Sequence, residues 1–168
     1  TLMGRSAESL AAAKDKLVLA YPQARVSTFA GDGLSPQDVG AAMDIAASGE
    51  ARFSIVVSTV GAGMSRSIAD SSADQFMDAV AYNVRPAFVA IREGIDRIAR
   101  DGAFAFISST AAMMPFDGMV GYCAGKAAHD HLVRTAAHEL GHLGHRFNAV
   151  RPGLTRTPAT VGLFASQP

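Results

Sequence analysis

The chain has 168 residues, of which 49% are hydrophobic and 18% are charged, and its 15 basic and 15 acidic residues give a formal net charge of zero. This length suits one domain with a real core better than two, so we expect residues 1–168 to form a single domain. The absence of a basic block or stripe argues against a nucleic-acid partner, and no apolar run approaches the ~20 residues needed to cross a bilayer.

The chain opens as though a strand were already under way, with Thr1-Leu2-Met3, so we expect the sequence to be a fragment of a longer protein. Residues 1–5 have none of the layout of a secretory signal. The only cysteine is Cys123, which excludes an internal disulfide. A single free thiol fits a reducing compartment, and we expect a cytoplasmic protein.

Short apolar runs alternate with helical stretches in the first half of the chain. Ser6 is a suitable N-cap for a helix that ends before Pro22, and a short strand is predicted over residues 25–29. Residues 35–38, Ser-Pro-Gln-Asp, combine a cap, a first-turn proline and an acid, which predicts a second helix start. Residues 53–57, Phe-Ser-Ile-Val-Val, are typical of a strand buried on both faces.

The same alternation continues in the second half. Ser72 and Gln75 have the spacing of a capping box, and they predict a long helix that runs to about Arg100. Apolar strands are predicted over residues 103–107 and 146–150, with an alanine-rich helix from Gly121 to about His142 between them. Strand–helix–strand alternation predicts an α/β fold with a parallel sheet.

A glycine-rich turn over residues 58–63, Ser-Thr-Val-Gly-Ala-Gly, follows the predicted strand at 53–57. Ligands of open α/β sheets bind outside the carboxyl ends of the strands, and glycine lets a ligand approach the backbone. Taken alone, the segment fits an ordinary tight turn equally well.

Tyr122 and Lys126 form the most informative pair. They are four residues apart on a predicted helix, so the phenol and the ammonium share a face and can project into one cleft. An ammonium beside a phenol favours the phenolate, which would make the tyrosine a usable acid/base near neutral pH. Ser109 follows the strand at 103–107, where its hydroxyl could hold a carbonyl oxygen beside Tyr122. Each feature alone also fits a surface helix or a loop.

Two further segments carry candidate site residues. Asn83 precedes Pro86 inside the predicted long helix, and the proline should kink this helix and free carbonyls near Asn83 for water. Pro152-Gly153 turns the chain after the last strand, and Thr157 beyond it could bind a carboxamide. Alone, these segments would be a kinked core helix and a loop.

Together, these residues resemble the short-chain dehydrogenase/reductase family in its common single-domain form. The match in order and spacing comprises Asn83, Ser109, Tyr122, Lys126 and Pro152-Gly153, and the resemblance extends from Gly4 to about Pro158. It implies a Rossmann-type doubly wound parallel sheet with helices on both faces. It also implies an oxidoreductase that interconverts a carbonyl and a secondary alcohol by hydride transfer.

The resemblance assigns a role to each residue of the proton-relay site. Tyr122 would be the general acid/base, and Ser109 would hydrogen-bond the substrate oxygen. Lys126 would bind the nicotinamide ribose and favour the Tyr122 phenolate, and Asn83 would hold a water. The cofactor-binding residues that the family implies are Arg5, Asp32, Ser58, Thr59, Val60, Gly61, Tyr122, Lys126, Pro152, Gly153 and Thr157.

Arg5 favours NADP over NAD as the cofactor. In the family, the position just past the end of the second strand faces the adenine ribose, and here Gly4 stands in place of an acid. An arginine fork suits the 2′-phosphate of NADP, whereas an acid would bind the ribose hydroxyls of NAD. Asp32 falls where the family often has an acid near the adenine ring.

The sequence departs from the family chiefly in what it lacks. Ser58, Thr59 and Val60 replace the family's Asn-Asn-Ala, which keeps two hydrogen-bonding groups. The family's first strand and glycine-rich phosphate loop are missing, as are the substrate lid and the final strand. Because that first strand is central, we expect two unpaired strand edges inside the protein. A non-catalytic dinucleotide-binding or scaffold protein is therefore the main alternative to an enzyme.

Residues 138–142, His-Glu-Leu-Gly-His, fit the H-E-x-x-H signature of zinc proteases. A zinc site would need a third ligand such as His145, which lies just before the strand at 146–150 and should leave the helical face. Gly141 and Gly144 also weaken the helix. We therefore expect no metal site, and a zinc hydrolase is the disfavoured alternative.

Apolar residues favour two further expectations about partners. The outer stretches of the two long helices include Phe88, Ile91, Ile95 and Leu132, and the family packs these helices between subunits, so we expect a homodimer or homotetramer. The apolar segment from Met113 to Phe116 indicates a hydrophobic small-molecule substrate.

Overall fold

The computed structural model describes residues 1–47, 52–63, 66–157 and 160–161. In chain order the elements are β1 (Leu2–Gly4), α1 (Ala7–Ala20), β2 (Thr28–Ala30), α2 (Pro36–Ala46), β3 (Phe53–Ser58), α3 (Ala73–Gly94), β4 (Ile98–Ile107), η1 (Thr110–Ala112), α4 (Val120–Leu140), η2 (Gly141–Leu143) and β5 (Arg146–Val150).

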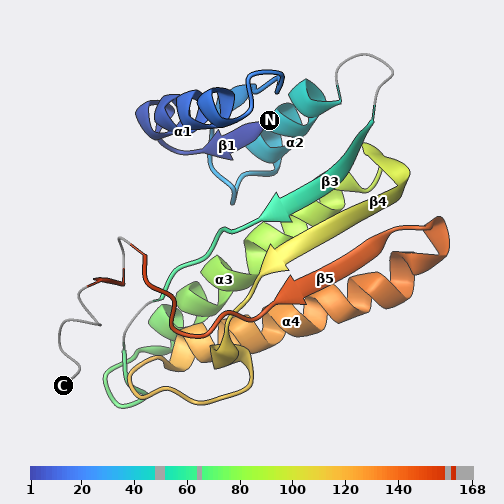
Figure 1. Ribbon diagram of the computed structural model, residues 1–168. Helices are drawn as coiled ribbons and strands as arrows, with labels where there is room; N and C mark the ends of the chain where they lie inside the picture. The colour runs from blue at the N-terminus through green and yellow to red at the C-terminus, as the bar shows by residue number, and fades with distance from the viewer. Residues whose placement is uncertain (48–51, 64–65, 158–159, 162–168) are drawn as a thin grey trace.

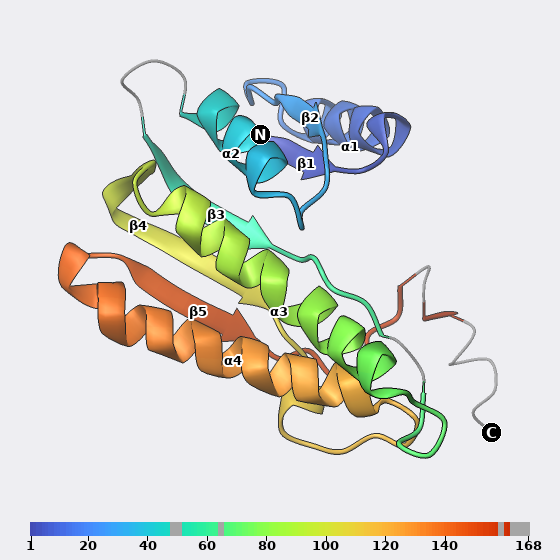
Figure 2. The same cartoon turned by 180° about the vertical axis from the view of Figure 1, so that it is seen from behind.

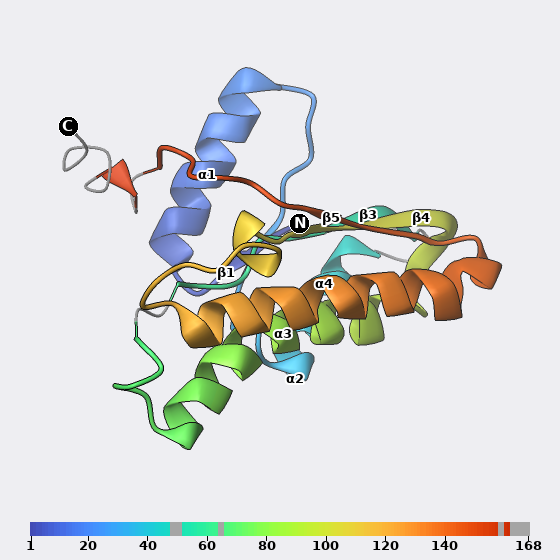
Figure 3. The ribbon, with the colours of Figure 1, turned by 90° about the horizontal axis from the view of Figure 1, so that it is seen from below.

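The strands form two parallel sheets, one in the order β1-β2 and one in the order β3-β4-β5 (Figure 1). Helix α1 covers one face, whereas α2, α3 and α4 cover the other (Figure 3). From behind, α3 and α4 lie side by side across the three-stranded sheet (Figure 2). The predicted α/β fold with parallel strands and helices on both faces is confirmed.

The edges of β1 and β3 bound a cavity of about 570 Å³ between the two sheets. No strand among the described residues pairs with either edge on this side. On β3, Ile55 and Val57 remain 64% and 61% exposed. The expectation of two unpaired strand edges therefore agrees with the sheet order.

Serine caps define the starts of α1, α2 and α3 as predicted. The hydroxyls of Ser6, Ser35 and Ser72 accept hydrogen bonds from the backbone three residues later. At Ser72 the capping box is complete, because Gln75 Oε1 also accepts from the Ser72 amide at 3.1 Å. Each cap satisfies an amide that the first helical turn leaves free, an effect that stabilises a helix by about 1 kcal/mol.

Four predicted elements have different bounds in the structure. Helix α3 stops at Gly94 instead of about Arg100, and β4 begins at Ile98 instead of residue 103, because Ile98 already pairs with Phe53 on β3. Strand β2 is residues 28–30 instead of 25–29, because pairing with β1 fixes its register. Helix α4 ends at Leu140, and η2 replaces its predicted last turn.

The core lies between the three-stranded sheet and the helices behind it. Phe104 and Phe147 stack with ring centroids 4.7 Å apart, and Phe106 is fully buried beside them. Burying one such side chain contributes about 1.5–3 kcal/mol. Ile91 belongs to this core, so its predicted place on an outer helix face is wrong.

Of the four residues predicted for that outer face, Phe88 is the exposed one, at 55%. Ile95 and Leu132 pack against the core at its margin.

None of the described helices is long and apolar enough to cross a membrane.

Candidate functional site

The site lies where the carboxyl ends of β3, β4 and β5 meet the first turns of α4. Two backbone hydrogen bonds join the segments after β4 and β5: Ser108 N donates to Val150 O at 2.7 Å, and Thr110 N donates to Pro152 O at 3.1 Å. Pro152 therefore lies beside the segment that carries Ser109.

Two glycines allow α4 to pack closely on α3. A Cβ at Gly121 would lie 2.6 Å from Cβ of Ala79, and one at Gly125 would lie 3.0 Å from Cβ of Asn83. Both distances are shorter than ordinary van der Waals contact. The glycines, one helical turn apart, bring the Tyr122 and Lys126 turn of α4 against Asn83.

Replacing Gly121 with alanine is expected to lower the free energy of unfolding by about 1–3 kcal/mol, because the new methyl collides with Ala79. This loss exceeds the gain of at most ~1 kcal/mol in helix propensity. Urea unfolding followed by circular dichroism measures the change. The control is Gly141→Ala, because nothing lies within 4 Å of a Cβ there. Equal stability of the two variants would contradict the close-packing argument.

Lys126 is buried beneath the strand ends, with only 4% of its surface exposed. Its ammonium donates a hydrogen bond to Ile107 O at 3.0 Å and lies 5.8 Å from the centroid of the Tyr122 ring. Burial lowers the pKa of Lys126, and the negative charge of Asp130 opposes this shift. The predicted Tyr122 and Lys126 pair thus shares one face of α4.

Asn83 is fully buried on α3, opposite Lys126. Its Nδ2 donates to Ala62 O at 3.1 Å and to Ala79 O at 3.0 Å, whereas no described protein group donates to Oδ1. Leaving a buried acceptor unpaired costs about 1–3 kcal/mol. Such an atom is a candidate for contact with a water or ligand.

Gly61 lies against both Asn83 and Lys126. A Cβ at this position would lie 3.0 Å from Asn83 Oδ1 and 3.1 Å from Lys126 Nζ. The side-chain-free backbone after β3 therefore sits directly against both polar atoms. Larger residues would displace the ammonium or the amide, so glycine is required here for space.

Ser109 follows the end of β4 on the same side, two residues after the carbonyl that binds Lys126. Its hydroxyl oxygen accepts a hydrogen bond from Ala111 N at 3.1 Å and so caps η1. The hydroxyl hydrogen remains available as a donor, which is the role that a carbonyl ligand requires.

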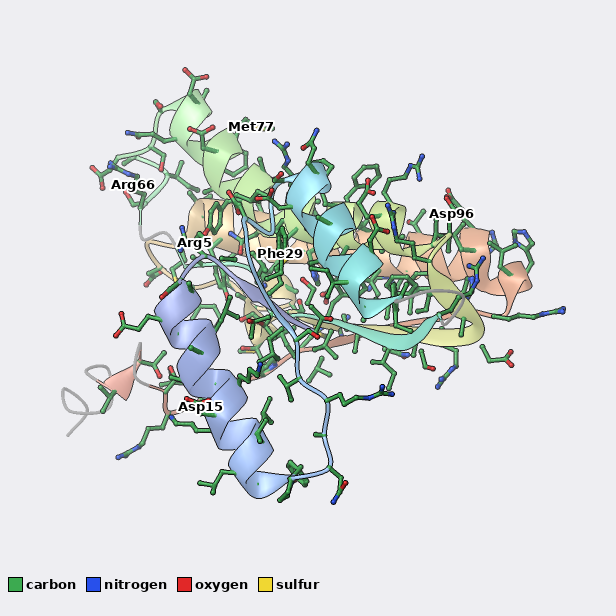
Figure 4. The ribbon with its side chains drawn as sticks, turned by 90° about the horizontal axis from the view of Figure 1, so that it is seen from above. Arg5, Asp15, Phe29, Arg66, Met77 and Asp96 are labelled. Carbon is green, nitrogen blue, oxygen red and sulfur yellow. The ribbon has the colours of Figure 1, made fainter. Side chains whose placement is uncertain are left out.

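The cavity between the sheets leads to this site. Six of the residues predicted to bind a cofactor line it, namely Arg5, Asp32, Ser58, Thr59, Val60 and Gly61. Figure 4 shows Arg5 at the junction of β1 and α1. Gly61 is thus both a wall of the cavity and a neighbour of Lys126.

The structure does not bring the whole predicted cofactor set to the cavity wall. Tyr122, Lys126, Pro152, Gly153 and Thr157 lie outside its described lining. Thr157 is exposed, and its hydroxyl oxygen lies 2.9 Å from that of Thr160.

The loop after β2 contacts the loop after β3. Asp32 N donates to Asp38 Oδ2 at 2.8 Å, and Asp32 Oδ1 accepts from Leu34 N at 3.0 Å, which fixes the turn. A Cβ at Gly33 would lie 2.9 Å from a Val60 methyl. This contact keeps Asp32 and Val60 on one rim of the cavity.

A second group of polar residues was not predicted from the sequence: Ser108, His129 and Asp130 are buried, and the more exposed Arg151 pairs with Asp130. The signal for it was available, because Asp130 follows Lys126 by four residues and shares its helix face.

The zinc motif does not form a site. His138 lies in the last turn of α4, but His142 lies in η2, beyond the helix end at Leu140. Within the part of the chain that the structure describes, no three His, Cys, Asp or Glu side chains are placed to hold a metal ion.

A profile of a family described as short chain dehydrogenase matches residues 1–168. The trans-4-hydroxycyclohexanecarboxylate dehydrogenase of Sinomonas cyclohexanicum is 28% identical over 110 residues, which are 65% of this chain and 42% of that protein. The 3alpha-hydroxysteroid dehydrogenase of Mediterraneibacter gnavus is 28% identical over 166 residues, 97% of this chain and 66% of that protein.

Solved structures share the fold. A short-chain type dehydrogenase/reductase from Mycobacterium ulcerans superposes with a TM-score of 0.91 at 26% identity, covering 98% of this chain and 62% of that one. The chain spans about half the length of the curated relatives that it matches, covering between 42% and 50% of three of them.

Proposed function

This chain belongs to the short-chain dehydrogenase/reductase family, and from that premise we propose that the full-length protein is an NADP(H)-dependent oxidoreductase that interconverts a carbonyl and a secondary alcohol. One observation carries the proposal: Asn83 Oδ1 and Lys126 Nζ converge on the backbone at Gly61, at the end of the cavity that Arg5 and Asp32 also line.

The residues of this chain would transfer the proton and position the substrate. Tyr122 would transfer a proton to or from the substrate oxygen while Ser109 donates a hydrogen bond to that oxygen. Lys126 would place a positive charge beside Tyr122, and Asn83 would hold a water through its unpaired Oδ1. The bound nicotinamide cofactor would supply the hydride.

The hydrogen-bond donors that line this cavity fit a dinucleotide. Gly61 holds the backbone after β3 against Lys126, and Ser58 and Thr59 offer hydroxyls on the cavity wall. Arg5 lies on the same wall, and its guanidinium suits a phosphate. We further propose that Pro152, Gly153 and Thr157 face the nicotinamide end.

Replacing Arg5 with alanine is expected to weaken NADPH binding by about 10- to 100-fold and to leave NADH binding nearly unchanged, because a charge-assisted hydrogen bond to the 2′-phosphate is lost. Titration of each nucleotide by nicotinamide fluorescence measures both constants. Arg25→Ala is the matched control, since Arg25 is an exposed arginine outside the cavity lining. An equal loss for both nucleotides would remove the assignment of Arg5 to the 2′-phosphate.

The proposed function is tested by nucleotide binding and turnover in the full-length protein. Tight NADPH binding with reduction of carbonyl compounds supports an oxidoreductase. Failure to bind either NADPH or NADH would overturn the hydride-transfer assignment.

A non-catalytic dinucleotide-binding or scaffold role is the second candidate. It is favoured by one observation: Tyr122 and Lys126 lie outside the described lining of the cavity. NADPH binding without turnover of any carbonyl or alcohol would support this role. The convergence of Asn83 and Lys126 on Gly61 favours the enzyme.

We also propose a cytoplasmic homo-oligomer that acts on an apolar small molecule. On α3, Phe88 and Met77 are 55% and 57% exposed, which suits burial against a second copy. Met113, Met114 and Phe116 are exposed beyond η1, near the proposed substrate end, and suit an apolar ligand.

A further inference from the structure

A buried carboxylate lies one helical turn beyond Lys126. Asp130 is 4% exposed, as is Lys126, and the two residues share one face of α4. An ionised side chain is seldom buried to this extent unless it is paired. The partners of Asp130 therefore indicate what it does.

Those partners come from the strand ends. Arg151, directly after β5, donates through Nε to Asp130 Oδ2. His129 Nδ1 lies 3.4 Å from Asp130 Oδ1. Burial raises the pKa of Asp130, but the neighbouring Ser108, Arg151 and His129 together hold it below its ordinary value. Asp130 is therefore an anion at neutral pH.

Arg151 is itself held between two backbone contacts. Val150 O accepts from Ser108 N, and Pro152 O accepts from Thr110 N, so the residues on both sides of Arg151 are tied to the segment after β4. The Asp130–Arg151 pair thus connects α4 to the turn that begins at Pro152. Both ends of this connection carry residues of the proposed site.

We propose that Asp130 is a positioning residue, which keeps the buried Lys126 ammonium charged and, through Arg151, fixes the Pro152-Gly153 turn relative to the Tyr122 and Lys126 face of α4. Its effect on catalysis rests on the proposed function. Its effect on Lys126 does not, because it follows from the placement of the charges alone.

The groups around Lys126 support this role. From α4 it faces Tyr122, His129 and Asp130, whereas α3 contributes the neutral Asn83, and the end of β4 contributes the Ile107 carbonyl. Burial lowers the pKa of His129, and the Lys126 charge lowers it further, so His129 is neutral at pH 7. Asp130 is the negative charge that favours the Lys126 ammonium.

A purely structural ion pair is the competing explanation. Buried pairs are often replaceable by apolar residues without loss of stability, so burial alone does not prove a role in the site. The two explanations differ in one respect: a pair that only joins α4 to the chain after β5 would leave both the Lys126 midpoint and kcat unaffected when the Asp130 carboxylate is neutralised in a folded variant.

The first experiment follows the titration of Lys126 by NMR of the isotopically labelled lysine side chain in the full-length protein without nucleotide. Asp130→Asn is expected to move the Lys126 midpoint to lower pH, because the opposing negative charge is lost. Glu139→Gln removes a carboxylate from an exposed position on the same helix and should not move the midpoint.

Arg151→Gln separates the effect of the Asp130 charge from the effect of breaking the Asp130–Arg151 ion pair. This variant breaks the ion pair but keeps the Asp130 carboxylate, so the Lys126 midpoint should not fall. A midpoint unchanged by Asp130→Asn, or lowered equally by Arg151→Gln, would overturn the proposal. If Asp130→Asn fails to fold, the Arg151→Gln variant still decides, because a fall in its midpoint contradicts the assigned role of the carboxylate.

The second experiment measures turnover. Asp130→Asn is expected to lower kcat by about 10- to 100-fold through misplacement of Lys126, with partial rescue in Asp130→Glu. Arg151→Gln should chiefly raise the KM for the nucleotide. An inactive unmodified protein would overturn the proposed function while leaving the NMR result valid. An active protein whose kcat is unaffected by Asp130→Asn would overturn the catalytic part of this inference.

Discussion

Replacing Tyr122 with phenylalanine is expected to lower kcat by about 10²- to 10⁴-fold, the range over which a positioned acid or base accelerates proton transfer. The variant keeps the ring that lies 5.8 Å from Lys126 Nζ and removes only the hydroxyl. The dissociation constant for NADPH should therefore change little. Steady-state kinetics with a carbonyl substrate and fluorescence titration of NADPH measure the two quantities.

The matched control for this variant is Tyr21→Phe, which removes a hydroxyl from a tyrosine that is 65% exposed after α1. Its kcat should equal that of the unmodified protein. If Tyr122→Phe retained more than a tenth of the activity, another group would have to deliver the proton, and the half-buried Tyr122 would become a packing residue.

Replacing Lys126 with methionine has the second-largest expected effect, a loss of about 10²- to 10³-fold in kcat, comparable with removing one preorganised donor from an active site. Methionine keeps an apolar stem of similar length but loses the hydrogen bond to Ile107 O and the charge beside Tyr122. Nucleotide binding should also weaken, because the ammonium lies next to the cavity wall at Gly61. This variant thus differs from Tyr122→Phe, in which binding is retained.

Lys16→Met provides the control, since it makes the same change at an exposed position on α1. Circular dichroism should show both variants folded. A Lys126→Met protein with unchanged kcat and unchanged NADPH affinity would contradict the proposed use of this ammonium.

Features set by neighbouring residues could be predicted from the sequence. The caps at Ser6, Ser35 and Ser72 satisfy amides only three residues away, and the helices begin where these serines indicate. The β5 bounds were also predicted, and the spacing of Tyr122 and Lys126 placed them on one helix face. Each of these features depends on a single turn or strand.

Features set by distant contacts could not be predicted in the same way. Strand β2 took its register from β1, and α3 ended early because the chain at Ile98 already pairs with β3. The sequence singled out Asn83 and Gly61 separately. That Gly61 touches both Asn83 and Lys126 depends on the close crossing of α3 and α4.

The pairing of Asp130 with Arg151 could not be predicted either, because it joins residues far apart in the sequence. Asp130 stands at helical spacing from Lys126, but only the fold shows that Arg151, which lies 21 residues further along the chain, pairs with it. Local spacing predicts which side chains share a face. Local spacing does not predict which charged residue of another helix or strand pairs with these side chains.

The open edge of β3 has a consequence for handling this 168-residue chain. Residues 53–58 contain no charge and no proline, and they present two exposed aliphatic side chains beside backbone groups without strand partners among the described residues. Such an edge is a template for intermolecular strand addition, which natural proteins suppress with charges, prolines or bulges. Concentrated solutions of the isolated chain should therefore tend toward ordered aggregates, and a lysine at position 55 or 57 would be the gatekeeper that opposes them.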